Sequence, residues 1–372
     1  MARAPALQEI EAAPEIDRLE GFPHPRQTVA LFGHEDAERT LAASISSGRM
    51  HHAWLLTGPE GIGKATLAYR AAIAALAEPY ERDAFGESLA IPAEATASRQ
   101  VRAMSHAGLL VLRRQYNLKD KRFPQSISVD EVRKLRSFLG HSSGSGGWRV
   151  VIVDSADELN VNAANALLKS LEEPPTRTIF LLVSSEPGRL LPTIRSRCRT
   201  LALGPLGDKA ISRAAKQALD TASAALPDGE EMATLLRLSD GSVRRFLSLL
   251  SGGGLDLYKQ IYALLAALPE VDWAKLHKLA DTLSGAAAEV RFELFFELLL
   301  AQIARLVRVG ATRTGDEADI RLAGRLATPQ RLASLAQVWE TVAREKADVV
   351  ALNLDRKTLI LRTVSRLEAT TR

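Results

Sequence analysis

The sequence predicts an α/β domain built on a parallel β-sheet, followed by a small helical domain and an all-α C-terminal domain. Up to Gly204, short apolar runs alternate with segments of helical period, which is typical of a parallel sheet covered by helices. After Gly204 the segments have helical period and break at proline or glycine. We therefore expect a flexible arm at 1–27, the α/β domain at 28–204, a helical domain at 205–252 and the C-terminal domain at 253–372.

The expected elements of the α/β domain follow from apolar spacing and from residues that end helices and strands. In chain order, we expect a helix at 35–46, a strand at 52–57, a helix at 64–77, a strand at 109–112, a helix at 130–139, a strand at 149–154, a helix at 162–173, and strands at 178–183 and 200–203. Asp130 is a candidate N-cap, and Pro174-Pro175 stops the helix that precedes it. We expect an insertion or long loop at 78–105 and a flexible loop at 141–147.

The composition excludes several classes of protein. The chain has 372 residues, 46% of them hydrophobic, so it contains enough apolar material for packed cores. Its single cysteine excludes a disulfide framework and any zinc site with two or more thiolates, and it suits a reducing cytosol. With 48 Lys+Arg and 44 Asp+Glu, the net charge of +4 produces no global basic field.

The sequence carries no signal-peptide pattern and no apolar stretch of bilayer length. The most apolar region, Phe292–Val309, is interrupted by charged and amide side chains, so it predicts an amphipathic or buried helix. We therefore expect a soluble cytoplasmic protein without a membrane partner.

A phosphate-binding loop is predicted between the strand at 52–57 and the helix at 64–77. Gly58 to Lys64 matches G-x-x-x-x-G-K, in which backbone N–H groups and the lysine surround phosphates at a helix N-terminus. A plain glycine-rich turn is disfavoured because a strand precedes the motif and a helix follows it. The candidate nucleotide contacts in this segment are Gly58, Gly61, Gly63, Lys64 and Thr66.

Two chemically active positions depart from the pattern of hydrolysing enzymes. Ala65 stands where a Ser or Thr hydroxyl would bind Mg²⁺. Asp154 ends the second buried strand, as an Mg²⁺-holding acid would, but Ser155 follows it in place of a general base. Asp157 and Glu158 lie further along the chain than the general base of such enzymes would. We expect the loop to permit ATP binding, Mg²⁺ binding to be weak or absent, and hydrolysis to be slow or absent.

An ordered set of motifs over about residues 28–250 resembles bacterial clamp-loader ATPases of the AAA+ family and their replication factor C relatives. The resemblance is carried by Gly33-His34-Glu35, His51-His52-Ala53, Asn165–Pro175, Ser196-Arg197-Cys198 and Gly241–Leu249. It implies a P-loop α/β domain, a helical lid at 205–252 and a C-terminal collar domain at 253–372 through which subunits assemble.

Within that family, the degraded phosphate site resembles the delta prime branch more than the gamma/tau motor branch. Four features favour the delta prime branch: Ala65, Ser155, the total length and the C-terminal run from Pro329 to Glu368. Many members carry a four-cysteine zinc module after the first helix of the phosphate loop. The corresponding segment, 78–107, has no cysteine, so we predict no zinc and no metal site.

The resemblance assigns a role to several side chains. Arg197 of the SRC motif is implied to act in trans, as an arginine finger on a neighbour's ATP; the alternative is a surface salt bridge. Ser184 and Ser185 fall at the position of a polar sensor, or else cap a strand. Arg244 matches a second sensor arginine that contacts phosphates if nucleotide binds and otherwise holds the lid. Cys198 is expected to be a small buried hydrophobe.

The implied partners are the gamma/tau motor and delta subunits, the sliding clamp and primer-template DNA. Residues 99–136 hold ten Lys/Arg and three Asp/Glu, which suits DNA phosphates or, equally, a solvated face with local ion pairs. The resemblance implies a subunit of the DNA polymerase III holoenzyme, although this chain shows no polymerase site. Two alternatives remain: an active clamp-loader ATPase motor using Asp157 or Glu158 as base, and an unrelated P-loop nucleotide switch.

Overall fold

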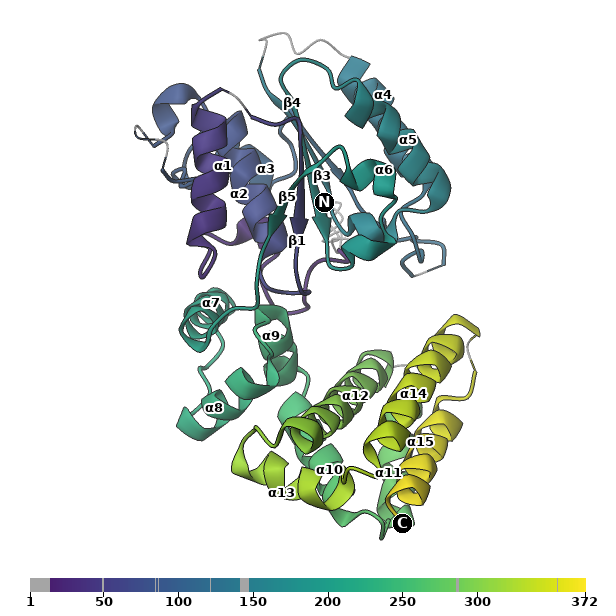
Figure 1. Ribbon diagram of the computed structural model, residues 1–372. Helices are drawn as coiled ribbons and strands as arrows, with labels where there is room; N and C mark the ends of the chain where they lie inside the picture. Colours follow the sequence, from purple (N-terminus) through teal and green to yellow (C-terminus); the bar gives the residue numbers. More distant parts are fainter. Residues whose placement is uncertain are drawn as a thin grey trace, which may run out of the picture. The chain divides into compact units, whose positions relative to one another are not determined.

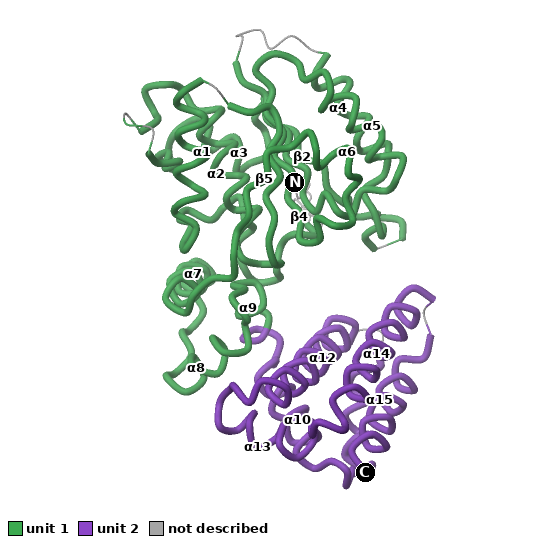
Figure 2. Tube along the Cα trace, viewed as in Figure 1, with its two compact units in different colours: residues 1–248 green, residues 249–372 purple. Residues whose placement is uncertain are grey.

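The computed structural model describes residues 14–48, 50–83, 85, 87–120, 122–140, 147–285, 288–352 and 354–372. The chain divides into two compact units, unit 1 at residues 1–248 and unit 2 at residues 249–372 (Figure 2). Each unit is described by itself below.

Unit 1 is built around a five-stranded parallel sheet in the part of the chain that the structure describes. Its strands are β1 (Ala53–Thr57), β2 (Leu109–Leu112), β3 (Arg149–Val153), β4 (Thr178–Ser184) and β5 (Arg199–Ala202), in the spatial order β2-β3-β4-β1-β5. Strands β1 and β4 are buried along their whole length, which explains their continuous apolar sequence. Because all neighbouring pairs are parallel, the carboxyl ends of the strands lie along one edge of the sheet.

Helices cover both faces of this sheet (Figure 1). On one side lie α1 (Glu35–Ser46), α2 (Lys64–Leu76) and α3 (Thr96–Arg102). On the other lie α4 (Val129–Gly140), α5 (Val161–Glu172) and the short α6 (Pro192–Arg195). Single 3-10 turns occur at η1 (Pro25–Gln27), η2 (Pro79–Glu81), η3 (Ala156–Glu158) and η4 (Pro187–Arg189). The predicted parallel α/β domain is confirmed.

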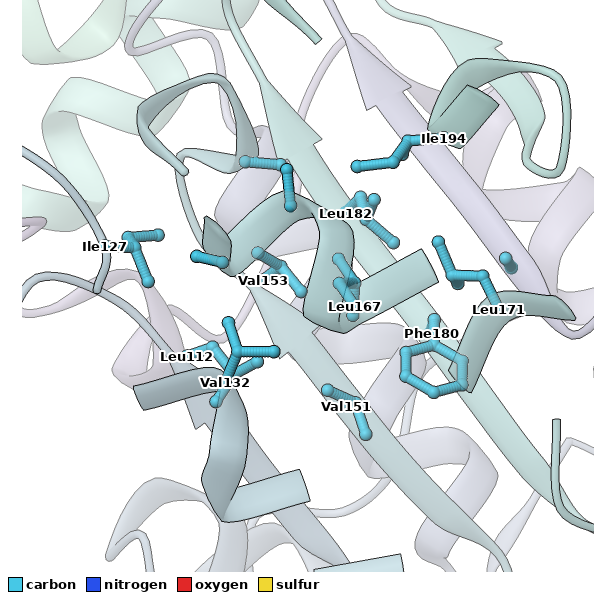
Figure 3. Close-up of a cluster of buried hydrophobic side chains, with 14 of the residues drawn as sticks. Leu112, Ile127, Val132, Val151, Val153, Leu167, Leu171, Phe180, Leu182 and Ile194 are labelled. Carbon is cyan, nitrogen blue, oxygen red and sulfur yellow. The ribbon is translucent and has the colours of Figure 1, made fainter. Parts of the chain in front are cut away.

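A hydrophobic core fills the space between the sheet and α4, α5 and α6. Figure 3 shows Val151 and Val153 of β3, and Phe180 and Leu182 of β4, pointing to the same side. They face side chains of the covering helices, including Leu167 of α5. Every second residue of each strand contributes because side chains alternate between the two faces of a sheet.

Two local expectations differ from the structure. The segment expected to be an insertion or long loop contains α3, whose Ala97 and Val101 are buried against the rest of unit 1. Asp130 is not an N-cap, because α4 begins one residue earlier and the Ser128 hydroxyl accepts from the Glu131 N–H at 3.4 Å. The predicted flexible loop at 141–147 lies outside the described residues except for Gly147.

The N-terminal segment 14–27 is packed, contrary to the flexible arm expected at 1–27; residues 1–13 lie outside the described residues. Phe22 is 6% exposed and His24 is 1% exposed. The Arg26 guanidinium donates from Nε to the carbonyl of Arg102 at 2.9 Å. The sequence of this segment is polar, and the segment packs because its charged side chains form ion pairs in the folded domain.

Three helices follow the sheet, namely α7 (Asp208–Thr221), α8 (Gly229–Leu238) and α9 (Val243–Ser251). Within this part of unit 1, the N–H of Leu206 donates to the carbonyl of Gly241 at 3.0 Å. The N–H of Arg244 donates to Gly61 at 3.3 Å. A separate domain with the bounds 205–252 stays a prediction.

Unit 2 is helical throughout its described residues. It contains α10 (Gly254–Ala267), α11 (Trp273–Ser284), α12 (Glu289–Thr312), α13 (Glu317–Leu326), α14 (Leu332–Leu352) and α15 (Arg356–Thr371). Helix α12 packs against α10, α11, α13 and α14, and it buries Phe292, Phe295 and Phe296. Among the helices described, none combines the length and the apolar character that a membrane span requires.

We predict that Leu167→Ala destabilises unit 1 by about 2–5 kcal/mol, because Leu167 is fully buried and the neighbouring strands cannot close the cavity. Urea unfolding followed by circular dichroism measures this. The matched control is Val161→Ala on the same helix, where the side chain is 67% exposed and the expected change is within about 0.5 kcal/mol. Equal effects of the two variants would contradict the core assignment.

Candidate functional site

The glycine-rich loop joins β1 to α2 in a backbone conformation that its glycines permit. Gly58, Gly61 and Gly63 have φ angles of 141°, 74° and 108°. A Cβ on Gly61 would lie 2.3 Å from the Ser242 hydroxyl and 2.5 Å from the Arg244 Cβ. The loop therefore requires glycine both for its left-handed turns and for the close approach of α9.

Lys64, the first residue of α2, is 5% exposed and points back into the loop. Its Nζ donates to the carbonyls of Gly58 at 2.7 Å and Pro59 at 2.5 Å, and to the Ser185 hydroxyl at 3.0 Å. Burial lowers the pKa of Lys64 to about 8, against the opposing effect of nearby carboxylates. The ammonium group thus donates its three hydrogen bonds to protein oxygens.

A buried histidine supports the loop from α1. His34 Nε2 lies 2.8 Å from the Ile62 carbonyl, and the ring is 7% exposed. His34 belongs to a motif noted in the sequence, but its role could not be assigned there, because its contact with Ile62 spans 28 residues of the chain. Thr66, one turn into α2, is 8% exposed, and Ala65 beside it offers no oxygen ligand.

Asp154 follows β3 directly and is buried at the carboxyl edge of the sheet. Its N–H donates to the Leu112 carbonyl at 2.9 Å, which continues the pairing of β2 with β3. Asp154 and Asp17 both line the cavity described below. Burial and the neighbouring Asp17 charge raise the pKa of Asp154 to about 8, which favours the protonated form of this carboxyl group.

Asp17 belongs to an ionic cluster that fixes the N-terminal segment. Its carboxylate lies 2.7 Å from His24 Nε2 and 2.7 Å from Arg113 Nη1. Arg113 also contacts Glu15 at 2.5 Å, and Glu15 contacts Arg26 at 2.7 Å. Burial alone would raise the pKa of Asp17, but its bond to His24 and the Arg113 charge lower it well below the usual range.

The acidic residues after Asp154 have partners of their own. Ser155 has φ 56°, which turns the chain into η3. The Ser185 N–H donates to Asp157 Oδ1 at 3.1 Å. Glu158 pairs with Arg114 through two contacts of 2.5 and 2.7 Å, and burial raises the pKa of Glu158. Both carboxylates line the same cavity as the phosphate loop.

The two serines after β4 occupy different environments. Ser184 is fully buried as the last residue of the strand, paired in register with Thr57, and its hydroxyl has no hydrogen-bond partner among the described residues. Ser185 contacts Lys64 and lines the cavity. Of the two serines expected at the sensor position, Ser185 is the one that contacts the loop, because successive residues of a strand face opposite sides.

Arg244 reaches the loop from α9. Its Nε lies 3.4 Å from Glu60 Oε1, and its Nη1 donates to the Asp17 carbonyl at 3.1 Å. The guanidinium therefore joins the phosphate loop to the N-terminal segment, a contact that the sequence did not predict.

These groups surround a cavity of about 470 Å³, which lies in the size range of small-molecule sites. One wall is apolar and comes from the N-terminal part of the chain, including Leu19, Phe22 and Phe32. The other wall contains six of the expected contacts: Gly61, Gly63, Lys64, Thr66, Asp154 and Arg244. Gly58, Ser184 and Arg197 are not among the described residues that line it.

The cavity fits a nucleotide phosphate better than it fits a divalent cation. The glycine turns and the N-terminus of α2 provide N–H donors, and Lys64 and Arg244 provide positive charge. For a cation, Ala65 offers no ligand, and burial raises the pKa of the Asp154 carboxyl group, which disfavours its charged form. Among the described residues, no group of three or more His, Cys, Asp or Glu side chains could hold a metal ion.

Arg197 lies just beyond α6, away from this cavity. Its Nη2 is 2.7 Å from Glu172 Oε1, and its Nη1 donates to the Thr193 carbonyl at 2.9 Å. The side chain is 35% exposed. Cys198 beside it is half-buried rather than fully buried; it packs against the core of unit 1, and burial raises the pKa of its thiol to about 11.

Several cations of the basic stretch 99–136 have partners within the chain. Arg113 and Arg114 contact acidic residues at the cavity, and two more pairs lie along α4: Arg133 with Asp130 and Lys134 with Glu131. Much of the local positive charge is therefore balanced in the fold.

Comparison with known proteins identifies the family. A family model described as DNA polymerase III, delta subunit, matches residues 33–207. The DNA polymerase III subunit delta' of Escherichia coli is 32% identical over 271 residues, which cover 71% of this chain and 73% of that protein. The chain belongs to this family of DNA polymerase III subunits. Membership and the parallel sheet together confirm the predicted AAA+ fold class.

Other known proteins are also similar to this chain. The delta' subunit of Pseudomonas aeruginosa is 42% identical over 209 residues, covering 55% of this chain and 58% of that protein. A gamma/tau subunit of Mycobacterium tuberculosis is 28% identical over 278 residues, covering 72% of this chain and 44% of that protein. A gamma subunit-related protein from Thermotoga maritima, of known crystal structure, aligns over 90% of this chain and 99% of its own at 17% identity, with a TM-score of only 0.40.

We predict that Asp154→Asn stabilises the protein at neutral and mildly alkaline pH. The pKa of Asp154 is raised from 3.8 to about 8 in the folded chain, so the contribution of Asp154 to stability falls as pH rises from about 4 towards 8. Asparagine does not ionise, so the variant should be more stable than wild type by roughly 1–3 kcal/mol at pH 8. Urea unfolding from pH 5 to pH 8.5 measures this, and parallel pH profiles would contradict the assignment.

Proposed function

We propose that the protein is a delta prime-like stator subunit of the bacterial replicative clamp loader. It would help to load the sliding clamp onto primed DNA, together with gamma/tau motor and delta subunits, in a cytoplasmic replisome at the nucleoid. The observation that carries this proposal is the form of its own phosphate site. The loop and Lys64 are intact, but Ala65 lacks the Mg²⁺ hydroxyl and Ser155 stands after Asp154 in place of a general base. Such a site suits nucleotide binding without efficient hydrolysis.

In this proposal Arg197 acts on the ATP of the neighbouring motor subunit. A guanidinium beside the γ-phosphate stabilises the charge that develops during phosphoryl transfer, and it is worth about 10³–10⁵ in rate. Two features support the role: Arg197 lies outside the chain's own cavity, and it is partly exposed. Its partner Glu172 is itself 46% exposed, so the ion pair is of the solvated kind that costs little to break.

An active ATPase motor is the second candidate, because Asp157 and Glu158 both line the cavity. The contacts argue against it: Asp157 accepts from the Ser185 N–H, and Glu158 is paired twice with Arg114. An unrelated nucleotide switch does not agree with the family to which the chain belongs. The collar role of residues 253–372 and any DNA contact by residues 99–136 stay proposals as well.

We predict that Arg197→Ala slows ATP hydrolysis at the adjacent motor site by about 10³-fold or more, while assembly persists. The measurement is clamp- and DNA-stimulated hydrolysis by the reconstituted complex, with subunit content checked by size-exclusion chromatography. The matched control is Arg195→Ala, an exposed arginine on the same turn, which should leave hydrolysis unchanged. Unchanged hydrolysis with Arg197→Ala in an intact complex would refute the arginine-finger role.

We also expect no ATP turnover above background from the purified chain alone. Sensitive phosphate release over hours measures this, with Lys64→Ala as the control. Turnover that Lys64→Ala abolishes would favour the motor alternative.

A further inference from the structure

A second cavity lies in the loop between β2 and α4, and no described residue lines both this cavity and the candidate nucleotide site. Its volume is about 440 Å³. The residues that line it include two aromatic, two amide and one basic side chain: Tyr116, Phe123, Gln115, Gln125 and Arg122. Neither the phosphate loop nor the proposed role of Arg197 makes use of this cavity.

The loop is held by contacts that leave the side chains of the cavity available. At its base, Arg114 pairs with Glu158 and donates from Nη1 to the Pro124 carbonyl at 3.2 Å. Nearer its turn, Asn117 and Arg122 form an antiparallel bridge, in which the Asn117 N–H donates to the Arg122 carbonyl at 2.9 Å. The two arms of the loop are therefore fixed in the absence of a ligand, which lowers the entropic cost of binding one.

Two aromatic rings stand across the loop from each other. Tyr116 precedes Asn117 and Phe123 follows Arg122, so the antiparallel bridge places the two rings on opposite arms. Their centroids lie 5.1 Å apart with an angle of 68° between the ring planes, which is an edge-to-face pair. Both side chains are half-buried, so part of the ring surface stays accessible at the cavity. Such surface can stack with a flat ring of a ligand.

The cations beside the rings are not neutralised by the fold. Lys119 and Arg122 are exposed, and neither has an ion-pair partner in the part of the chain that the structure describes. Asp120 is the acid among the described residues that line the cavity, and its Oδ2 accepts from Asn117 Nδ2 at 2.6 Å. The rim of the cavity therefore carries more positive than negative charge, which favours a polyanion.

Rings, cations and amides together fit an unpaired nucleobase with its flanking phosphates. The side chains of Gln115 and Gln125 make no hydrogen bond within the described part of the chain, and each amide can both donate to and accept from the edge of a base. A base inside a duplex is already stacked and paired, so it could not enter the cavity without being flipped out. An acidic peptide would satisfy the cations but would leave the rings and the amides unused.

We propose that this cavity binds single-stranded nucleic acid. Tyr116 and Phe123 stack against one unpaired base, and Lys119 and Arg122 contact the neighbouring phosphates. The identity of the strand rests on the proposed function, in which it is the unpaired template beside a primer. Strand binding by the purified chain needs no other subunit, so it can fail while clamp loading and the role of Arg197 stand, and the reverse also holds.

The test is equilibrium binding of a fluorescein-labelled oligothymidine to the full chain, followed by fluorescence anisotropy at low salt. An abasic strand of the same length and a hairpin duplex carry the same label. Wild type should bind oligothymidine most tightly, because that probe alone offers unpaired bases as well as phosphates. The abasic strand should bind about tenfold more weakly, which is within the range of one stack between a base and an aromatic side chain.

Substitutions of Tyr116 separate stacking from simple packing. Tyr116→Leu keeps an apolar side chain but removes the ring, so it should weaken oligothymidine binding about tenfold and leave binding of the abasic strand unchanged. Tyr116→Phe keeps the ring and should bind as wild type does. The matched control is Tyr80→Ala, which removes a tyrosine that is 84% exposed and lies outside the cavity. It should change neither affinity.

Arg122→Ala tests the phosphate contact. It should weaken binding of oligothymidine and of the abasic strand by the same factor, because both keep their phosphates. It should also reduce the slope of log affinity against log salt concentration by about 0.7, the contribution of one phosphate contact to single-stranded DNA. Arg39→Ala, which removes an exposed arginine of α1, is the control and should leave the slope unchanged.

Three results would overturn the proposal. Wild type could fail to bind oligothymidine, or bind the abasic strand or the duplex as tightly, in which case no unpaired base is recognised. Tyr116→Leu could bind every probe as wild type does. An oligoglutamate peptide could displace the strand and itself depend on Tyr116, which would make an acidic peptide the ligand. If Tyr116→Leu does not fold, as judged by circular dichroism, Phe123→Leu makes the same test from the opposite arm of the loop.

Discussion

The parallel pairing of β1 and β3 with β4 is the constraint on which the candidate site depends. In this register the carboxyl ends of the three strands lie along one edge of the sheet, so the chain leaves them in the same direction. The glycine loop after β1, Asp154 after β3 and Ser185 after β4 therefore meet around one cavity. Lys64 then reaches Ser185 across this edge, although the two residues lie far apart in sequence.

Several buried or half-buried charged groups lie around this edge. Burial raises the pKa of Asp154, which favours its neutral form, and the neighbouring Asp17 carboxylate contacts Arg113 and His24. Removing one partner of such a cluster leaves the others unpaired, so its members depend on one another. The same cluster fastens the N-terminal segment to the domain and brings it to Arg244. The packing of the N-terminal segment and the arrangement of the phosphate site therefore depend on each other.

The local features could be read from the sequence. The alternation of apolar strands and helices predicted every strand of the sheet to within about two residues, because burial on both faces leaves continuous apolar runs. The glycine loop followed from its fixed spacing, and Ala65 and Ser155 identified the degraded site. Helix α3 was missed, because its seven residues are too few for a helical period to stand out.

By itself, therefore, the sequence determined the fold class, the phosphate loop and the family likeness, since these depend on spacing within short segments. Only the tertiary structure decided which side chains share the cavity. It brought Ser185, and not Ser184, to Lys64, because one step along a strand reverses the face, and it placed His34 against the Ile62 carbonyl of the loop. It also brought Asp17 to Asp154, since contacts between distant segments leave no periodic trace in sequence and arise only when the sheet is assembled.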